Sequence, residues 1–245
     1  MALIDNLVAY YKFDESSGNA SDSSGNSNTL TNNNTVGYSA ALINNGADFA
    51  RLNSRNFSII ASSQTGLAVT GNAISMNIWH RGNANLNNVI GRLFWRLGGT
   101  GNYGYQLSTT GNVYSPNNAY LVSLVGIGGG TDFAFGTATM ATDGTRRMIT
   151  ATYNGTNIKC YINGSLVSTS GTLSNYLTNA NAQTFYVGAS SGGDFIDGQL
   201  DESAIWSRAI TDTEITSLYN GGLGLTYPFG AGATPARLLT MMGIG

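Results

Sequence analysis

Charged side chains are scarce in this chain of 245 residues. Asp, Glu, Lys and Arg together make up 10% of it, with 13 acids and 11 bases, whereas an ordinary soluble domain has about 25%. The net charge of −2 gives no electrostatic basis for binding nucleic acid or an anionic membrane. Lysine occurs only as Lys12 and Lys159, so long charged surface helices are not expected.

Cysteine and histidine each occur once, as Cys160 and His80. A single cysteine excludes an intramolecular disulfide and a cysteine-rich metal site. Cys160 alternates with Ile158 and Ile162, which predicts a buried thiol that packs as a small hydrophobic group. His80 ends a predicted strand, and no Gly-x-Ser-x-Gly turn accompanies it. We therefore expect a structural or surface histidine and no catalytic triad.

Long apolar runs are also absent. No stretch approaches the ~18 apolar residues of a membrane span. The first residues lack the basic segment followed by an apolar one that marks a secretory signal. We expect no membrane association and no signal peptide in this chain, with an N-terminus that is either native or left by removal of a leader.

What fills the chain is a series of short segments rich in β-branched and aromatic residues, separated by Gly, Asn and Ser. They predict strands at 7–13, 47–49, 58–60, 73–81, 89–97, 103–108, 119–127, 132–138, 147–153, 157–162, 166–168, 185–189 and 198–206. Asn154-Gly155 and Asn163-Gly164 are strong hairpin signals. This pattern predicts an all-β fold, a two-sheet antiparallel jelly-roll sandwich.

One short C-terminal helix is predicted after the last strand. Thr211 and Glu214 form a capping box at its start. Ile215, Leu218 and Tyr219 give it one apolar stripe. Gly221 or Gly222 can take the left-handed conformation that ends a helix. In the strand before it, Leu200, Ala204 and Trp206 fall at even spacing, which predicts that they share one face, with Asp201 and Ser203 on the other.

We expect a single domain over residues 1–229, followed by a flexible apolar C-terminal arm over residues 230–245. The arm contains Leu238, Leu239, Met241 and Met242 close together. One interpretation is a frayed tail that packs on its own domain. The other is an assembly arm that binds a neighbouring subunit, since exposed apolar clusters usually mark contacts, and this predicts a homo-oligomer.

Three segments together resemble the laminin G-like, concanavalin A-like (pentraxin-type) jelly-roll family. They are LVAYYKFDESSGNASDSSGNSNTL, RRMITATYNGTNIKCYINGSLVSTSG and FIDGQLDESAIWSRAITDTEITSLYNGG. The resemblance covers Leu7 to about Tyr219 and implies that the last strand lies against the first. One departure is Phe49 to Phe57, which holds no acid where the family commonly has Phe-Asp-Gly and paired aspartates. Ligand functions that depend on those carboxylates are not expected here.

The acids of the chain do not predict an active site. Glycoside hydrolases of this fold need two carboxylates flanking the scissile bond, and in the related enzymes these follow a Glu-x-Asp-x-Glu pattern that is absent here. Asp194, Asp197, Asp201 and Glu202 are irregularly spaced, and the adjacent pair would point to opposite faces of a strand. We therefore expect a protein that is not an enzyme.

A single structural Ca²⁺ is the metal site that the sequence favours. Calcium takes six to eight oxygens, which flexible Asp/Asn/Gly loops supply. Asp22 and Asn26 lie in the first loop and Asp201 on the last strand, and the pairing implied by the resemblance would let them share an ion. The alternative is that Asp22 forms an Asx turn and Asp201 accepts hydrogen bonds from backbone amides.

Carbohydrate binding would require exposed aromatic and amide groups. The candidates are Tyr103, Tyr105, Tyr114 and Tyr120, with Asn117 and Asn118. The same tyrosines are equally typical of strand residues that pack against their neighbours, so the sequence identifies no sugar site.

Two functions follow. The first is a non-enzymatic structural or adhesive surface protein, a phage virion component such as a capsid decoration, fibre or tail protein, with glycan or receptor binding and subunit contacts through 230–245. The alternative is a carbohydrate-binding or adhesion module of a secreted bacterial protein. We expect a location on a virion or an extracellular surface: a virion protein leaves its host by lysis and needs no signal peptide, whereas the secreted module would have had its leader or neighbouring domains removed.

Overall fold

A computed structural model describes residues 1–83, 90–98, 103–111, 117–125, 131–135, 143–172 and 182–230 of the chain. For Tyr103, Val125 and residues 131–135 it describes the backbone alone. The predicted arm lies outside the described residues from position 231 onward.

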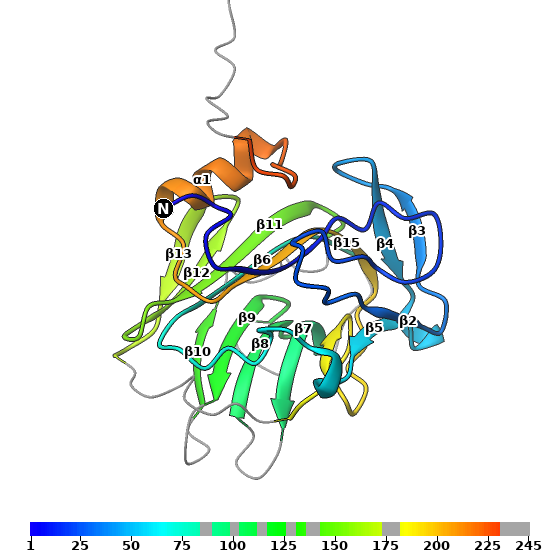
Figure 1. Ribbon diagram of the computed structural model, residues 1–245, viewed down its shortest axis with the longest axis horizontal. Coiled ribbons are helices and arrows are strands. Elements are labelled where there is room, and N and C mark those ends of the chain that lie inside the picture. The colour runs from blue at the N-terminus through cyan, green and yellow to red at the C-terminus, as the bar shows by residue number, and fades with distance from the viewer. Residues whose placement is uncertain are drawn as a thin grey trace, which may run out of the picture.

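Two antiparallel sheets packed face to face form the molecule (Figure 1). The first sheet has the order β13 (Ser165–Thr169), β12 (Ile158–Ile162), β11 (Arg146–Tyr153), β6 (Ile74–Gly82), β15 (Gly198–Trp206), β4 (Asn45–Phe49) and β3 (Gly37–Ala40), and β1 (Leu7–Tyr11) also pairs with β15. The second sheet has the order β10 (Thr131–Phe135), β9 (Tyr120–Val125), β8 (Tyr103–Thr109), β7 (Gly91–Gly98), β14 (Phe185–Val187), β5 (Asn56–Ile59) and β2 (Thr31–Asn33). The predicted sandwich is confirmed.

The strands follow the predicted segments closely, with two additions. The edge strands β2 (TNN) and β3 (GYSA) contain two Asn, one Gly and one Ala, residue types that are depleted in strands. They form because β5 and β4 offer them a free edge. The expected hairpin between β12 and β13 is confirmed, with Asn163 and Gly164 both at positive φ (51° and 79°), as a tight two-residue turn requires.

The interior core between the sheets comes from alternate residues of the facing strands. In the second sheet these include Phe57, Phe94, Tyr105, Leu107 and Val122, and in the first Ile78, Ile149, Ala151, Ile158 and Cys160. Cys160 is fully buried, as predicted. Burial of this much apolar surface, at about 25 cal/mol per Å², is what stabilises a chain with so few charges.

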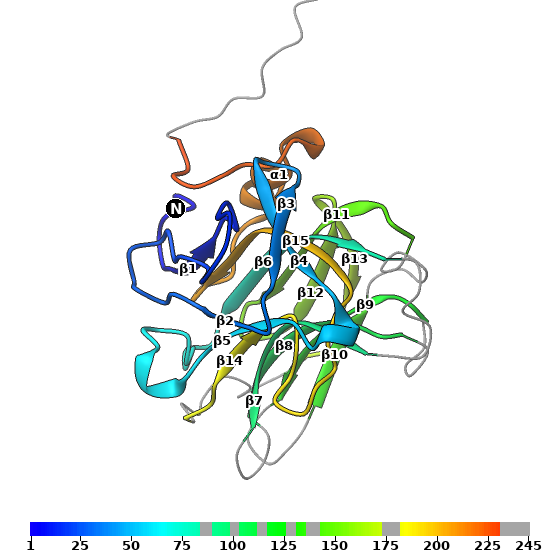
Figure 2. The same ribbon diagram turned by 90° about the vertical axis from the view of Figure 1, so that its right-hand side faces the viewer.

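A second apolar layer covers the outside of the first sheet. Figures 1 and 2 show α1 (Asp212–Tyr219) and the segment after it above this sheet, beside the N-terminus. We call this layer the outer cluster; its buried members are Leu3, Leu7, Tyr10, Trp79, Met148, Tyr161, Ala204, Trp206, Ile210, Ile215 and Leu218, with Leu42, Tyr219, Leu225, Tyr227 and Phe229 packed against them. Side chains up to Phe229 therefore pack on the sandwich, and β15 is buried on both faces.

The expected alternation of β15 is wrong in one respect. Leu200 belongs to the interior core, whereas Ala204 and Trp206 belong to the outer cluster on the opposite face. The reason is a β-bulge between Asp201 and Ala204, where Glu202 has φ 45°. A bulge inserts a residue and reverses the alternation beyond it.

The helix α1 begins as predicted. The Thr211 side chain accepts from the Glu214 amide, and the Glu214 side chain accepts from the Thr211 amide, which completes the capping box. The helix ends at Tyr219; its C-cap, Asn220, takes the left-handed conformation (φ 48°), and Gly221 follows at φ 63°. No helix within the described ranges is long and apolar enough to cross a membrane. Short 3₁₀ turns occur at Arg51–Asn53, Ala61–Ser63 and Asn220–Gly222.

Candidate functional site

One continuous row of register pairs crosses the second sheet from the edge strand β2 to β9. Its members, which we call the outer row, are Thr31, Ser58, Tyr186, Trp95, Gln106 and Ser123. Residues flanking the row on the same strands, such as Phe57, Phe94 and Leu107, are in the interior core. Because side chains alternate along a strand, the outer row points away from the core.

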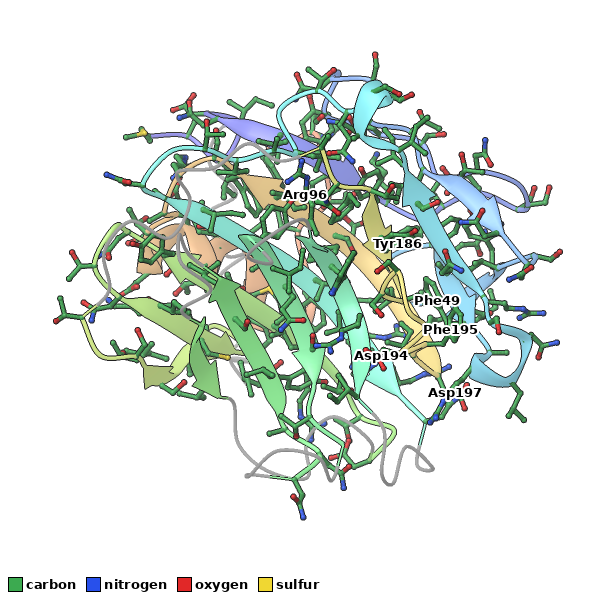
Figure 3. All side chains as sticks on the ribbon, turned by 90° about the horizontal axis from the view of Figure 1, so that it is seen from below. Phe49, Arg96, Tyr186, Asp194, Phe195 and Asp197 are labelled. Atoms are coloured by element: carbon green, nitrogen blue, oxygen red, sulfur yellow. The ribbon has the colours of Figure 1, made fainter. Side chains whose placement is uncertain are left out.

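Accessibility changes along this row. Thr31 is exposed, and Ser58, Tyr186 and Trp95 are half-buried, whereas Gln106 and Ser123 are buried. Figure 3 looks toward this sheet and places Tyr186 between Arg96 and Asp194. The accessible part of the row is therefore centred on β5, β14 and β7.

Two aromatic rings form the centre of the accessible part. The centroids of Trp95 and Tyr186 lie 5.8 Å apart, with their planes at 66°. This edge-to-face geometry is favoured by the ring quadrupoles. Each ring leaves part of its surface open to solvent while its strand is anchored in the core by Phe94 or Val187.

A chain of polar groups adjoins the two rings. Arg92 donates through Nε to Asp194 Oδ2 (3.1 Å) and through Nη1 to Gln106 Oε1 (2.5 Å) and Ser108 Oγ (3.2 Å). Gln106 in turn donates to Ser123 Oγ (3.0 Å). The amide N–H of Arg92 donates to the Asp194 carbonyl (3.0 Å), which fixes Asp194 beside the guanidinium.

Together these groups offer both kinds of contact that a polyhydroxylated ligand needs. The aromatic faces provide flat apolar area with little loss of side-chain entropy. The carboxylate, guanidinium and hydroxyl groups provide acceptors and donors in fixed directions. A shallow surface of this kind suits a ligand that lies along the strands.

The sequence left open whether the candidate tyrosines contact a sugar or pack against their neighbours, and the two whose side chains are described pack inward. Tyr105 and Tyr120 are both in the interior core. The hydroxyl of Tyr105 donates to the Leu67 carbonyl (2.9 Å), and that of Tyr120 is bonded to His80 Nδ1 (2.9 Å). Tyr114 and the Tyr103 side chain lie outside the described residues.

The surroundings of His80 suit a structural role. Its ring is fully buried, and burial together with the Arg147 charge lowers its pKa to about 3. The imidazole is neutral at all ordinary pH values and acts as a structural partner of Tyr120, in agreement with the sequence-based expectation.

Asp22 and Asn26 hold the first loop against β1. Asp22 Oδ1 accepts from the amides of Tyr10 (3.0 Å) and Ser24 (2.9 Å), and its Oδ2 accepts from that of Asn28 (2.9 Å). The side-chain amide Nδ2 of Asn26 donates to the backbone carbonyls of Leu7 and Val8. These bonds match the Asx-turn alternative and need no cation.

Asp201 has a separate set of partners. Its Oδ2 accepts from the amides of Leu42 (3.0 Å) and Ile43 (3.1 Å) in the β3–β4 turn. Within the part of the chain that the structure describes, no group of three His, Cys, Asp or Glu side chains is arranged to hold a metal ion. The shared calcium site remains a prediction from the sequence.

Asp201 and Glu202 are brought together on one side of the sheet by the bulge, contrary to the expected opposite orientation. Asp201 accepts a hydrogen bond from the backbone amide of Leu42, whose side chain packs against the outer cluster. Glu202 Oε2 is bonded to the hydroxyl of Tyr10, which is a member of that cluster. Both acids are about 1% exposed. Burial raises the pKa of Asp201 to about 7 and that of Glu202 to about 8.

The sequence did not single out Trp95 and Tyr186. The predicted strand at 89–97 did indicate that Trp95 and its neighbour Phe94 point to opposite faces of a sheet. Which of these two faces is buried depends on the order of strands in the sheet. The neighbour of β7 is β14, which lies far from it in the sequence. Local patterning carries no information about that pairing.

Comparison with known proteins identifies the family. The sequence model of the concanavalin A-like lectin/glucanases superfamily matches residues 55–216, which is well over half of the chain. No curated protein matches the chain significantly.

Solved structures share the fold. The binding domain of botulinum neurotoxin serotype C1 has a TM-score of 0.69 at 14% identity, covering 90% of this chain and 53% of that one. The binding domain of Paraclostridial Mosquitocidal Protein 1 has a TM-score of 0.68 at 17% identity, covering 90% and 53%. This chain thus spans about half the length of these toxin domains.

A third structure is of similar size to this chain. Domain 4 of an extracellular arabinanase from Geobacillus stearothermophilus, solved in complex with arabinotriose, has a TM-score of 0.61 at 20% identity, covering 86% of this chain and 97% of its own. The family match, the resemblance of three segments and the two-sheet sandwich agree. The chain therefore belongs to the concanavalin A-like lectin/glucanase superfamily.

Proposed function

We propose that this chain is a non-catalytic glycan-binding module that holds a saccharide across Tyr186 and Trp95 on the outer face of its second sheet. The observation that carries the proposal is that two half-exposed aromatic rings on one register row lie beside the polar chain Asp194–Arg92–Gln106, which meets the row at Gln106. A pyranose or furanose ring packs its C–H face on an aromatic ring, while its hydroxyls pair with the adjoining polar groups.

Two of the structural neighbours support this choice of ligand class. The binding domain of botulinum neurotoxin DC was solved with SialylT, and the arabinanase domain with arabinotriose. Their identity to this chain is low, so the proposal rests on the residues of the outer row and takes from the neighbours only the ligand class.

Hydrolysis is not part of the proposal. A glycosidase needs two carboxylates flanking the bond, one of them able to give up a proton near neutral pH. Asp194, the acid in the polar chain, is paired with Arg92. Asp201 and Glu202 do titrate near neutrality, but they are buried beneath the outer cluster of the other sheet, where no substrate reaches them.

The narrower proposal, a virion component that uses this module at a host surface, rests on the sequence. It depends on the low charge and on the arm at 230–245, most of which lies outside the described residues. Native mass spectrometry of the full chain and of a chain ending at Phe229 tests it. A defined oligomer that requires the arm supports a structural subunit, and a monomer in both cases favours the secreted module.

Glycan binding itself is tested with an array of saccharides followed by calorimetric titration of the best one. Tryptophan emission gives an independent readout, because Trp79 and Trp206 are buried and Trp95 is the half-exposed indole. We expect the saccharide to change the emission of the wild type and to leave that of Trp95→Phe unchanged. The absence of binding to any saccharide would contradict the proposal.

A further inference from the structure

A row of polar register partners crosses the first sheet on its outer face. Its members, which we call the polar row, are Asp48 on β4, Gln199 on β15, Arg81 on β6 and Arg146 on β11. Phe49 and Leu200, which follow members of the row in the chain, are in the interior core, so the row itself points outward. Trp79 and Met148, two residues along β6 and β11 on the same face, belong to the outer cluster. The polar row therefore lies at the border of that cluster.

Two guanidinium groups stand directly opposite each other in this row, those of Arg81 and Arg146. Side chains opposed in this way have Cβ atoms about 5 Å apart, and like charges there repel. Arg81 is exposed, and within the described ranges its side chain has no hydrogen bond or ion pair. Arg146 is half-buried, and burial together with the Arg81 charge lowers its pKa. An anion beside the pair would therefore stabilise both cations.

Gln199 fixes the position of Arg146. The Gln199 side chain is buried, and its Nε2 donates to Ser39 Oγ (3.0 Å) and to Asp48 Oδ1 (3.2 Å). The amide nitrogen thus faces β3 and β4, and the oxygen accepts from Nη2 of Arg146. A guanidinium has five N–H donors, and this is the one hydrogen bond of Arg146 to a described side chain. The group is held in place with donors to spare.

The acids around the pair have partners of their own. Asp143 is paired with Arg147 (2.6 Å), and the Asp197 carboxylate accepts from Asn83 (3.2 Å). Asp201 is buried and accepts from the backbone amides of the β3–β4 turn. Asp48 and Asp201 offset part of the positive charge at Arg146. In the described part of the chain, however, neither guanidinium of the pair contacts a carboxylate.

We infer that Arg81 and Arg146 together bind a dianionic phosphate group, either free or as a monoester. The site is separate from the proposed saccharide site, which lies on the other sheet. A phosphate monoester carries close to two negative charges at neutral pH and has three strong acceptor oxygens. Guanidinium forks on two adjacent strands match both the charge and the oxygens. A carboxylate or a sulfate ester carries one charge and would leave half of the pair uncompensated.

Amide chemical shifts of the labelled full chain, in a buffer of low ionic strength, measure the binding of three probes: methyl phosphate, inorganic phosphate and methyl sulfate. Methyl sulfate has the shape of methyl phosphate with one charge fewer. The variants Arg81→Gln and Arg146→Gln each remove one guanidinium. Lys159→Gln is the matched control, because Lys159 lies on the outer face of the same sheet opposite Thr152, six residues along β11 from Arg146. Thermal melts establish that each variant is folded.

We expect the phosphate probes to bind at least about tenfold more tightly than methyl sulfate, since a hydrogen bond to a charged group is worth about that factor or more. The preference should be lost in Arg81→Gln and Arg146→Gln and kept in Lys159→Gln. The tighter of the two phosphate probes identifies the source of the group. Without ligand, Arg81→Gln should melt no lower than the wild type, because it removes one of two opposed like charges. If Arg146→Gln does not fold, Arg81→Gln, at an exposed residue, carries the conclusion.

Other outcomes would contradict the inference. Wild-type phosphate affinity in Arg81→Gln, or no binding of either phosphate probe, would overturn the site. Equal affinity for methyl sulfate and methyl phosphate would overturn the choice of a dianion. Trp95→Phe, on the other sheet, should bind phosphate like the wild type, and loss of phosphate binding in this variant would show that the anion lies elsewhere.

Discussion

The indole of Trp95 and the phenol ring of Tyr186 lie edge to face, 5.8 Å apart, on a register pair that joins β7 to β14. The residues next to them in the chain, Phe94 and Val187, are in the interior core. The two rings are therefore fixed by the sandwich before any ligand arrives. Such preorganisation lowers the entropic cost of binding.

Asp194→Asn is expected to separate binding from stability. The Asp194 carboxylate pairs with Arg92 at 3.1 Å and is 39% exposed, and ion pairs of this kind contribute roughly 0–1 kcal/mol to stability. We expect the free energy of unfolding in urea to change by less than about 1 kcal/mol, and saccharide affinity to fall by roughly tenfold, as for a lost hydrogen bond to a charged group. The matched control is Asp197→Asn, since Asp197 bonds to Asn83. Unchanged affinity in Asp194→Asn would contradict this role.

Gly188→Ala is expected to destabilise the fold by about 2 kcal/mol or more. Gly188 has φ +87°, and a Cβ there would collide with the Phe49 ring. Its backbone also joins Leu93 to Ile196 through two hydrogen bonds, so the strain would displace the segment that carries Asp194. Gly192→Ala, where a Cβ meets nothing nearer than 4.0 Å, is the control and should change stability by less than about 1 kcal/mol. Equal melting temperatures for the two variants would contradict the argument.

The buried acids Asp201 and Glu202 predict an unusual pH dependence of stability. Their folded-state pKa values, about 7 and about 8, lie above the ordinary values of about 4. The native state therefore holds more protons than the unfolded state between these limits, and the free energy of unfolding decreases as pH rises from about 4 to about 8. We expect a loss on the order of a few kcal/mol over this range.

Urea unfolding of the wild type and of Glu202→Gln at pH 5 and pH 8 measures this dependence. The variant keeps a polar partner for Tyr10 but cannot ionise, so its stability should change less with pH. Asp143→Asn is the control: its Arg147 partner lowers the pKa of Asp143 to about 2, and it does not titrate in this range. A wild type more stable at pH 8 than at pH 5 would refute the assignment.

The thiol of Cys160 is expected to be unreactive in the native state. It is fully buried on β12, between its register partners Ala151 on β11 and Ser168 on β13, and burial raises its pKa to about 12. Thiolate is the reactive form, so labelling with a disulfide reagent should require unfolding. Rapid labelling at pH 7.5 without denaturant would contradict the assigned burial.

Much of the fold was predictable because its signals are local. The Asn163-Gly164 turn, the capping box of Thr211 and Glu214, and the alternation that buries Cys160 each depend on a few neighbouring residues. The pairing of β1 with β15, implied by the family resemblance, is also confirmed.

The errors came from features that depend on distant contacts. The bulge at Glu202 reverses the alternation of β15, and no residue type marks it in the sequence. Whether Tyr105 and Tyr120 face a ligand or the core was left open by the sequence; they pack inward, because the strand faces are decided by the register of β8 against β7 and β9. The candidate site itself depends on the contact of β14 with β7.

Calorimetric titration of the array-selected saccharide into Trp95→Ala and Tyr186→Ala tests the central claim most directly. Each truncation removes a central aromatic contact, for which a loss of about 2 kcal/mol, or roughly 30-fold in affinity, is typical. Leu52→Ala, at a fully exposed residue away from the outer row, should bind like the wild type. We predict that both aromatic variants remain folded and lose at least this much affinity; wild-type affinity in both would show that the saccharide does not lie on the outer row.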